Sequence, residues 1–362
     1  MTGAIAPIHH WVLHVDLDQF IAAVEVLRRP ELAGLPVVVG GDGDPTKRGV
    51  VATASYEARE LGVGSGMPMR TALKKAPDAV FLPADHAAYD EASAAVMDTL
   101  RSLEWGGGQV VVEVLGWDEA FVGAGPDATG DPDPVAFATE IRTRVLEATR
   151  LHCSVGIGDN KLRAKIATEF GKPRGSYVLT ADNWFEVMGD RPTRALWGIG
   201  AKTAKKLSAL GIDTVHQLAH SDARVLAAEL GPTMGPWYHR IGRGVSDSTV
   251  SAEPWVPRAH GRETTFQEDL DDWDRIADEV RALTRRVVVD IDKEGRPAAR
   301  VGLKIRFRPF LTLTRSLTLP QPSNDPGTLA AAAVSLLDRV EHDRPVRLLG
   351  VRLEMVEPEG GY

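Results

Sequence analysis

The sequence predicts an α+β protein built from several domains, and three observations support this prediction. The chain has 362 residues, of which 43% are hydrophobic, so it is long enough to bury more than one core. In its first half, the predicted elements follow the order strand, helix, hairpin, helix and strand, which is typical of a split βαβ sheet. Its second half is at first helical and punctuated by glycine, and then alternates helix and strand after a polar segment that contains proline.

The first half begins with a short apolar strand and a helix. Residues 11–15, WVLHV, are typical of a buried strand, which delivers Asp16 to its end. The following DQFIAAVEVLRR has the apolar spacing of three and four that predicts a helix, ended before Pro30. Further on we expect a strand at 35–41, a strand-to-helix passage at 49–63, and a helix and a strand in MPMRTALKKAPDAVFLP.

A hairpin and two more helices complete this half. A helix is expected at about 86–104, and QVVVEVLGWDEAFVGA then predicts two strands around a tight turn, followed by the turn-rich loop GPDATGDPDP. The helix VAFATEIRTRVLEATR and the strand LHCSVGIG follow. Together these elements predict a two-layer domain with helices on one face of the sheet.

The second half contains a helical region, a linker and a small α+β domain. Helices dominate from about residue 173, with LWGIGAKTAKKLSALGI at their centre. Residues 244–257 are polar, contain proline and lack periodicity, which is typical of a linker. The remainder predicts a long helix in DLDDWDRIADEVRALTRRVVVDIDKEG, a helix at about 327–340, and strands in ARVGLKIRFRPF, TRSLTLP and RPVRLLGVRLEMVEP.

Composition excludes several classes of protein. No apolar stretch reaches the roughly 18 residues that a membrane span needs, and MTGAIAPIHHW lacks the features of a signal peptide. The single cysteine, Cys153, excludes a disulfide framework and fits a reducing compartment, so we expect a cytoplasmic protein. The net charge of −8 argues mildly against a nucleic-acid partner, although the distribution of charge matters more than its sum.

Three acidic residues stand at strand ends. Asp16 ends the first strand, and Asp118 and Glu119 lie in the turn of the predicted hairpin, where adjacent side chains can face one site. Converging carboxylates repel one another unless divalent cations lie among them. The alternative is a solvated turn, which is common for an Asp-Glu pair, but both flanks are apolar here. Asp18, directly before a helix, is predicted to be its N-cap.

A basic ladder is predicted in ARVGLKIRFRPF, because alternate side chains of a strand share a face. One face is apolar, and the other carries Arg300, Gly302, Lys304, Arg306 and Arg308. No acidic residue occurs between Arg296 and Asp325. Cations about 6.6–7 Å apart suit contacts to phosphates along a duplex, and such contacts read no sequence. The alternative is a solvated edge strand.

Several segments together resemble the Y-family DNA polymerases, in the branch of the bacterial DNA polymerases IV. They follow the family's order and spacing from about residue 11 to 357: HVDLDQFIAAVE, VVATASYEAR with GVGSGMP, GWDEAF, SVGIGDNKLRAKIATEFGKP, GIGAKTAKKL, GRETTF and LLGVRLE. The resemblance implies a right-hand polymerase with a ferredoxin-like palm, small fingers, a helical helix-hairpin-helix thumb and an α+β little finger. The implied boundaries are palm 1–18 and 86–172, fingers 19–85, thumb 173–243, linker 244–257 and little finger 258–357.

The resemblance also implies a two-metal active site. Asp16 and Asp118 match the family's paired metal ligands, Glu119 matches its third acid, and the backbone carbonyl of Leu17 matches the remaining protein ligand. Two Mg²⁺ ions are implied, with Mn²⁺ as the alternative metal. The implied reaction transfers a nucleotide from a dNTP to the 3′-hydroxyl of a primer on template DNA. Low fidelity and lesion bypass follow from the family's small fingers and open site, and no proofreading domain fits in so short a chain.

Further resemblances concern the triphosphate and the DNA. Tyr56, Arg59 and Lys165 are implied to contact the phosphates, with Thr53 as a further candidate, although Arg59 and Lys165 could instead be solvated helix charges. The segment GIGAKTAKKL fits the turn and second helix of a helix-hairpin-helix. In it, backbone N–H groups would approach a DNA phosphate, with a glycine-capped helix pair as the alternative. The DNA-binding residues expected in this segment are Gly198, Gly200, Lys202 and Lys205.

The chain departs from the family's pattern at three places. After Phe20 the family has an aromatic residue that blocks the sugar 2′-hydroxyl, whereas this chain has Ile21. We therefore place both residues at the nucleotide and expect weakened discrimination against rNTPs. Gly116 and Trp117 replace the family's Ser-Ile, so one hydroxyl near the metals is lost. The chain ends VEPEGGY, without the glutamine-and-leucine tail that binds the sliding clamp, so recruitment by the clamp is not expected.

Two rival functions remain open. A nucleotide cyclase also uses an acidic hairpin turn and two metals, but it needs no surface for a duplex. A DNA-binding accessory protein with a decayed active site would not need Asp16, Asp118 and Glu119 intact. Primer extension separates these functions, and for the polymerase we expect a monomer with no membrane partner.

Overall fold

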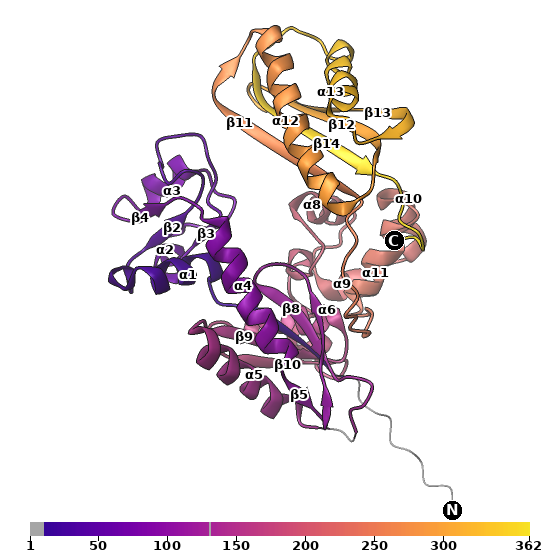
Figure 1. Ribbon diagram of the computed structural model, residues 1–362. Helices are drawn as coiled ribbons and strands as arrows, with labels where there is room; N and C mark the ends of the chain where they lie inside the picture. Colours follow the sequence, from indigo (N-terminus) through magenta and orange to yellow (C-terminus); the bar gives the residue numbers. More distant parts are fainter. Residues whose placement is uncertain (1–10, 130–131) are drawn as a thin grey trace, which may run out of the picture. The chain divides into compact units, whose positions relative to one another are not determined.

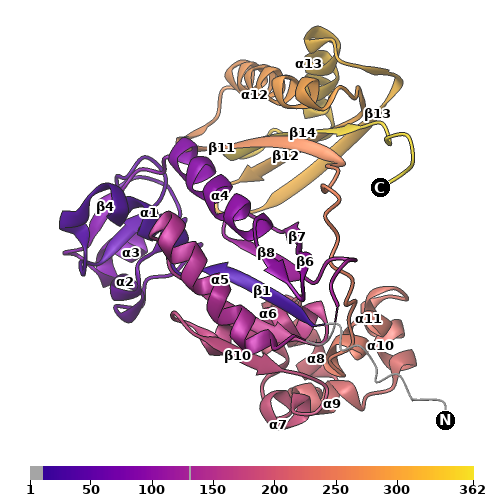
Figure 2. The same cartoon turned by 60° about the horizontal axis from the view of Figure 1, so that its bottom comes forward.

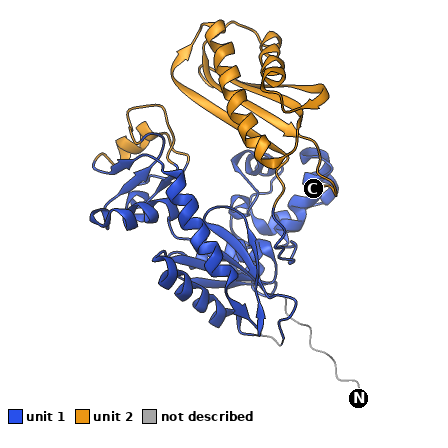
Figure 3. Cartoon of the chain, in the orientation of Figure 1, with its two compact units in different colours: residues 1–42, 52–65, 78–254 blue, residues 43–51, 66–77, 255–362 orange. Residues whose placement is uncertain are grey.

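A computed structural model describes residues 11–129 and 132–362 and divides the chain into two compact units (Figures 1 and 3). Unit 1 comprises residues up to 42, 52–65 and 78–254, and unit 2 comprises residues 43–51, 66–77 and 255–362. The start of the predicted palm, residues 1–10, and residues 130–131 of the predicted loop lie outside the described residues. Within the described part of the chain, every helix is too short or too polar to cross a membrane.

Unit 1 is built around a five-stranded sheet with the order β10-β9-β1-β8-β7 (Figure 2). The strands are β1 (Val12–Leu17), β7 (Val111–Val114), β8 (Glu119–Gly123), β9 (Cys153–Gly158) and β10 (Ser176–Leu179). β1 is antiparallel to both of its neighbours, while β10 is parallel to β9. The predicted hairpin is β7 and β8, and its turn lies beside the end of the central strand β1.

Two helices cover one face of this sheet. They are α4 (His86–Arg101) and α5 (Pro134–Thr149), which pack against each other and share a hydrophobic core with Leu13 and Val15 of β1. The side chains of β1 alternate, so the neighbouring His14 and Asp16 lie on the opposite face.

A third helix, α6 (Lys161–Gly171), packs on that opposite face. Gly156 and Gly158 of β9 permit its close approach, because a Cβ atom at these positions would lie 1.9 Å and 2.4 Å from backbone atoms of Ala164. The prediction that helices cover only one face of the sheet is therefore wrong. The glycines of SVGIG were a signal for this second helical layer, because they leave room for the helix to approach the strand, but the prediction did not use them.

A smaller three-stranded sheet with the order β3-β2-β4 lies in the segment predicted to form the fingers. Its strands are β2 (Val37–Val39), β3 (Thr53–Ala54) and β4 (Val80–Leu82). The helices of this segment are α1 (Phe20–Arg28), the 3-10 turn Pro30–Leu32, α2 (Tyr56–Glu60) and α3 (Met69–Lys75), of which α3 groups with unit 2. A separate two-stranded ribbon pairs β5 (Glu104–Trp105) with β6 (Gly108–Gln109).

Short helices follow β10 and share one core. They are α7 (Trp184–Met188), the 3-10 turn Thr193–Ala195, α8 (Ala201–Ala209), α9 (Val215–Ala219), α10 (Ala223–Leu230) and α11 (Met234–Gly242). The segment predicted as a linker has no helix or strand. Its first part is nevertheless bonded within unit 1, where Lys161 N–H donates to Asp247 at 2.9 Å and Ser251 N–H donates to Glu113 at 2.8 Å.

Unit 2 is built around an antiparallel four-stranded sheet with the order β11-β14-β12-β13. The strands are β11 (Ala259–Leu270), β12 (Ala298–Phe307), β13 (Thr312–Ser323) and β14 (Val346–Met355). Two helices, α12 (Trp273–Glu294) and α13 (Pro326–Ser335), and the 3-10 turn Leu337–Arg339 cover one face of the sheet. β11 was not predicted, because most of its side chains are polar and exposed.

The alternation predicted for β12 is present. Apolar residues such as Leu303 and Ile305 are buried against the helices, while Lys304 and its basic neighbours lie on the other face. β12 is an internal strand, so the alternative of a solvated edge strand is wrong. The prediction that Arg308 belongs to the basic face of this strand is wrong. β12 ends at Phe307, and Arg308 lies in the connection to β13, where its backbone N–H donates to the carbonyl of Pro345.

Candidate active site

The strand register brings two of the three predicted acids together, with the third in the adjoining turn. Asp16 lies directly opposite Glu119 in the antiparallel pair of β1 and β8, so both side chains share one face of the sheet. Asp118 lies in the preceding turn, where its carbonyl oxygen accepts a hydrogen bond from Leu17 N–H at 2.8 Å. Asp16, Leu17 and Asp118 line one cavity of about 230 Å³. Ligand atoms of His14, Asp16 and Glu119 lie within 4.8 Å of one another.

Two lysines supply positive charge at these acids. The Lys172 ammonium lies 2.9 Å from Asp16 Oδ1, and the Lys165 ammonium bonds to the Glu119 carboxylate. The side chains of Asp16 and Glu119 are only 15% and 26% exposed, so both ion pairs are partly withdrawn from water. Carboxylates in such a position are costly without a cation. The site is therefore suited to hold positive charge.

Burial and hydrogen bonding move the pKa values of these acids in opposite directions. Burial raises the pKa of Asp16 and of Asp118, although the nearby Lys172 opposes both shifts. The His14 imidazole, together with the ammonium group beside it, holds the pKa of Glu119 at about 2. Burial lowers the pKa of His14, which favours the neutral imidazole. Glu119 is thus a firmly ionised carboxylate, whereas burial destabilises the ionised forms of Asp16 and Asp118.

The cavity beside the acids also contains most of the residues predicted to bind the nucleotide. Phe20 and Ile21 of α1 line it, with Thr53 and Arg59 from the segment around β3 and α2. Lys172 at the C-terminal end of α6 completes its basic lining. The cavity therefore combines two carboxylates, two cationic side chains and an apolar edge at Phe20 and Ile21.

Lys172 was missed in the sequence analysis, and Lys165 was chosen instead. Lys165 lines a different cavity of about 480 Å³ together with His14 and Trp197, and its ammonium lies 5.4 Å from the Trp197 ring. Lys165 and Lys172 are seven residues apart, so they lie on the same face of α6, with Lys172 at its C-terminal end. That spacing was a signal in NKLRAKIATEFGKP that could have identified Lys172.

Tyr56 does not line the cavity of about 230 Å³ but anchors the backbone next to it. Its hydroxyl donates to Asp18 at 2.8 Å, and Ser154 Oγ and Arg174 N–H each donate to the same carboxylate at 2.9 Å. The predicted N-cap role of Asp18 is therefore wrong. Gln19 occupies the N-cap position of α1, in a left-handed conformation and without a side-chain cap bond. Donors from three separate segments, of which Ser154 is buried, compete successfully for Asp18.

The two glycines of the predicted helix-hairpin-helix have different surroundings. Gly198 has a φ of +95°, and a Cβ there would lie 2.4 Å from the Trp237 ring. Gly200 is the N-cap of α8, and a Cβ added to it would meet nothing within 4 Å. Lys202 and Lys205 are exposed on α8. The N-terminus of this helix is therefore open to an approaching anion.

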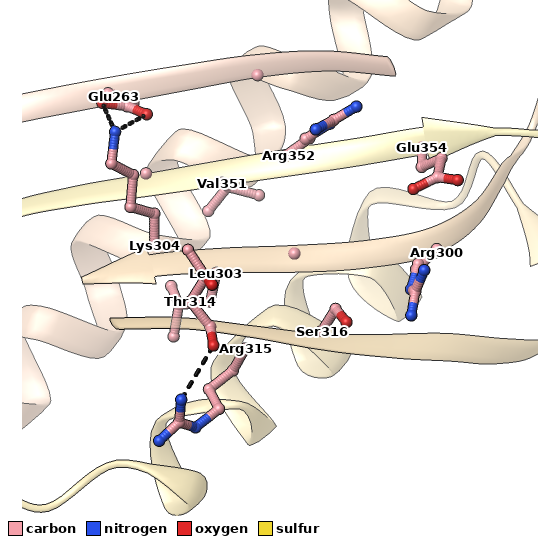
Figure 4. A pocket seen from close by; sticks show the side chains of 13 residues that line it. Glu263, Arg300, Leu303, Lys304, Thr314, Arg315, Ser316, Val351, Arg352 and Glu354 are labelled. Atoms are coloured by element: carbon pink, nitrogen blue, oxygen red, sulfur yellow. Dashed lines mark hydrogen bonds and ion pairs between the residues drawn. The ribbon is translucent and has the colours of Figure 1, made fainter. Parts of the chain in front are cut away.

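The basic residues of unit 2 lie over a groove of about 660 Å³ on the exposed face of the sheet (Figure 4). Arg300 and Lys304 of β12 stand on this face, as predicted, whereas Arg315 and Arg352 were not singled out from the sequence. The glycines that leave the groove open are Gly261, Gly302 and Gly350. Figure 4 shows Lys304 bonded to Glu263 on β11, at 2.7 Å and 2.9 Å. Arg306 instead bonds to Thr312.

Family models match most of the chain. Residues 15–169 match the model of the impB/mucB/samB family, and residues 257–362 match the model of that family's C-terminal domain. DNA polymerase IV 2 of Mycobacterium tuberculosis (strain ATCC 25618 / H37Rv) is 50% identical over 347 residues, which cover 95% of this chain and 98% of the relative. DNA polymerase IV of Methanoculleus marisnigri is 40% identical, with 96% of this chain and 94% of the relative covered.

Two solved structures of DNA polymerases are also similar to this chain. A Y-family DNA polymerase chimera of Dbh and Dpo4 superposes with a TM-score of 0.80 at 25% identity, covering 95% of this chain and 98% of the other. The insertion ternary complex of Dbh DNA polymerase has a TM-score of 0.63 at 26% identity, covering 96% and 99% of the two chains.

Proposed function

Because this chain belongs to the impB/mucB/samB family and is a Y-family DNA polymerase of the DNA polymerase IV branch, we propose which of its residues carry out the reaction. The enzyme is a DNA-directed DNA polymerase of the translesion type, and the other two functions considered from the sequence are not favoured. Its substrates in this proposal are primer-template DNA and a dNTP. The observation that carries the assignment is the strand register that pairs Asp16 with Glu119 beside Asp118.

Y-family polymerases use divalent metals, and the acids of this chain fit such ions. We infer that two Mg²⁺ ions are held by Asp16, Asp118, Glu119 and the carbonyl of Leu17, with Mn²⁺ as an alternative. Oxygen ligands suit both metals. The ammonium groups paired with Asp16 and Glu119 support this, since they show that these carboxylates are stable when a cation is close. When bound, such ions acidify the primer 3′-hydroxyl and neutralise the triphosphate.

In this proposal the chain's own cations hold the triphosphate. Arg59 and Lys172 line the cavity beside Asp16 and Asp118, which suits clustered phosphates next to a metal-binding acid. Thr53 offers a hydroxyl to the same cavity, and Tyr56 holds the adjoining backbone through Asp18. Lys165 acts instead at Glu119, where the His14 imidazole and the Lys165 ammonium together keep the carboxylate ionised.

The sugar of the nucleotide is placed at Phe20 and Ile21, which line the same cavity. A branched aliphatic side chain at position 21 leaves more room near a 2′-hydroxyl than an aromatic ring would. We therefore expect discrimination against rNTPs to be weakened, so that rNTPs are inserted in addition to dNTPs. Single-nucleotide insertion with both substrates tests this: Ile21→Phe should raise the preference for dNTP by at least about tenfold. A wild-type sugar preference as strict as that of the variant would rule the idea out.

The DNA is placed along two surfaces. The N-terminus of α8, with Gly198, Gly200, Lys202 and Lys205, would receive a backbone phosphate. The exposed face of the unit 2 sheet, with Arg300, Lys304 and Arg306, would follow the duplex without reading its sequence.

Neither surface requires a second copy of the chain, so a monomer is proposed. Cys153 is free and buried, which is compatible with a cytoplasmic protein.

Primer extension with Mg²⁺ tests the assignment of the acids. Asp118→Ala should lower the rate of synthesis on the order of 10³-fold or more, because it removes a metal ligand, while the Kd for primer-template DNA stays unchanged. Asp98→Ala is the matched control, since Asp98 is an exposed aspartate on α4 away from the cavity. Synthesis that survives in Asp118→Ala would show that Asp118 is not a metal ligand. DNA binding without synthesis by the wild type would indicate an accessory protein.

A further inference from the structure

Trp117 stands directly before Asp118 and reaches a neighbouring helix. Its indole Nε1–H donates to Asp90 Oδ1 on α4 at 2.8 Å. Its ring also contacts the rings of His86 and Tyr89 on the same helix, with centroid distances of 5.4 Å and 6.1 Å. The side chain that follows Gly116 thus joins the metal-binding turn to α4, and all of these residues belong to unit 1.

The helix that receives Trp117 is itself firmly held. Tyr89 is fully buried, and its hydroxyl donates to Glu25 on α1 at 2.6 Å. Burial and this hydrogen bond raise the pKa of Tyr89 to about 12. Glu25 is also fully buried and is paired with Arg28 and Arg29 of α1. The anchor for the turn is therefore connected to the helix that carries Phe20 and Ile21.

The turn itself has few other restraints. Its backbone bonds run from Leu115 N–H and Gly116 N–H to the carbonyl of Glu119, at 3.0 Å and 3.3 Å. A Cβ at Gly116 would have no neighbour closer than 3.8 Å, which is Asp118 Oδ1. A glycine at an open turn position allows many backbone conformations. Without the indole, the turn would be restrained by these backbone bonds and the bond from Leu17, and the Asp118 carboxylate by a hydrogen bond from its own backbone N–H.

We propose that Trp117 is a positioning residue for Asp118, acting through its hydrogen bond to Asp90 and its ring contacts on α4. The anchor restricts the flexible turn and aims the Asp118 carboxylate at the cavity it shares with Asp16. Preorganised ligands bind a metal more tightly than mobile ones, because less conformational entropy is lost on binding. This inference depends on the proposed function, in which Asp118 holds a divalent ion.

Mn²⁺ binding tests the inference without turnover. The protein is saturated with dNTP and with primer-template DNA ending in a dideoxynucleotide, and free Mn²⁺ is followed by electron paramagnetic resonance. Trp117→Phe keeps an aromatic ring but loses the N–H donor, and should weaken Mn²⁺ binding about threefold, as expected for one exposed hydrogen bond. Trp117→Ala should weaken it about tenfold. Trp255→Phe is the matched control, because Trp255 is exposed and lies in unit 2.

The acceptor supplies a rescue experiment. Asp90→Asn keeps a side-chain oxygen for the indole and should bind Mn²⁺ like the wild type, whereas Asp90→Leu should resemble Trp117→Phe. The double variant Trp117→Phe with Asp90→Leu should be no weaker than either single variant, because both remove the same bond. The Kd for DNA and the melting temperature should change little in all of them.

Four outcomes would overturn the inference: unchanged Mn²⁺ affinity in Trp117→Phe, equal losses in Asp90→Asn and Asp90→Leu, additive effects in the double variant, or a fall in melting temperature that parallels the loss of affinity. The proposed function fails by a different result. If Asp118→Ala leaves Mn²⁺ binding and synthesis intact, Asp118 is not a ligand, whatever Trp117 does.

Discussion

The palm sheet of unit 1 and the exposed sheet face of unit 2 both carry charged side chains, but under opposite conditions. In the palm, Asp16 and Glu119 are mostly withdrawn from water, and each has a lysine fixed beside it. On the unit 2 face, Lys304 and its partner Glu263 are 32% and 46% exposed. The first region holds like charges at strand ends, whereas the second distributes cations along a strand.

Buried and exposed charges are suited to different functions. A buried carboxylate requires a fixed cation, so its partner determines its pKa and its readiness to bind a metal. An exposed ion pair is screened by salt and stabilises the fold by only about 0–1 kcal/mol. The palm therefore has a site for specific chemistry, while the face of unit 2 is suited to salt-sensitive, sequence-independent contact with phosphates.

Among the charged side chains compared here, the largest effect is expected at Lys172, the partly buried lysine of the cavity proposed to hold the triphosphate. Lys172→Ala should lower kcat/KM for the incoming dNTP about ten- to hundredfold, because a charge-assisted contact to phosphate is lost. Lys165→Ala should act mainly on kcat, through Glu119, and leave the KM for dNTP nearly unchanged. Steady-state insertion kinetics distinguish the two lysines. A larger rise in KM for Lys165→Ala than for Lys172→Ala would restore the assignment made from the sequence.

A smaller effect is expected on stability in the absence of metal. Burial raises the folded-state pKa of Asp118 above its unfolded value, so the folded protein binds the extra proton more tightly and the ionised carboxylate destabilises the fold. That cost is fully present above the folded pKa and disappears below the unfolded pKa. Asp118→Asn should therefore raise the melting temperature by about 2 °C at pH 8.

Lowering the pH supplies the control for this prediction. The difference between Asp118→Asn and the wild type should shrink as the pH approaches the pKa of Asp118 from above, because the wild-type carboxyl then becomes neutral too. Glu119 behaves in the opposite way. Its pKa of about 2 lies below the unfolded value, so its stabilising contribution is present near neutrality and is lost in acid. A lower melting temperature for Asp118→Asn at pH 8 would contradict the argument.

On the exposed face of unit 2, single changes should have modest effects. Lys304→Ala should weaken binding of duplex DNA about threefold at low salt, equally for all sequences. The slope of log Kd against log salt should fall by about one, as expected for the loss of one phosphate contact. Fluorescence anisotropy over a series of salt concentrations measures both. A change that depended on sequence would show that this face reads bases.

The smallest effect is expected from the acid that pairs with Lys304. Glu263→Gln removes a negative charge from the groove and should strengthen DNA binding about twofold at low salt, with no effect at high salt. Anisotropy titrations with the variant and the wild type provide the test. Weaker binding of Glu263→Gln would indicate that Glu263 orients Lys304 rather than competing with the phosphates for it.

Local sequence patterns predicted much of this molecule. The alternation in ARVGLKIRF predicted which side chains of β12 are buried, because a strand presents alternate residues to opposite faces. The hairpin and its turn at Asp118 were predicted, but Glu119 was wrongly placed in that turn, because it is the first residue of β8. Predictions failed where a partner from a distant segment intervened. Asp18 serves Tyr56 and Ser154 in place of the helix end.

Most of the elements, the acids at strand ends and the basic alternation could be predicted from local sequence, because they follow from periodicities of two and 3.6 residues and from turn chemistry, whereas the polar strand β11 was not recognised. The folded structure was needed to show that Glu119 lies opposite Asp16, that Lys172 rather than Lys165 lines the cavity, and that Trp117 bonds to Asp90. These partners come from separate elements, and their meeting depends on strand register and helix packing, which local spacing in the chain does not encode.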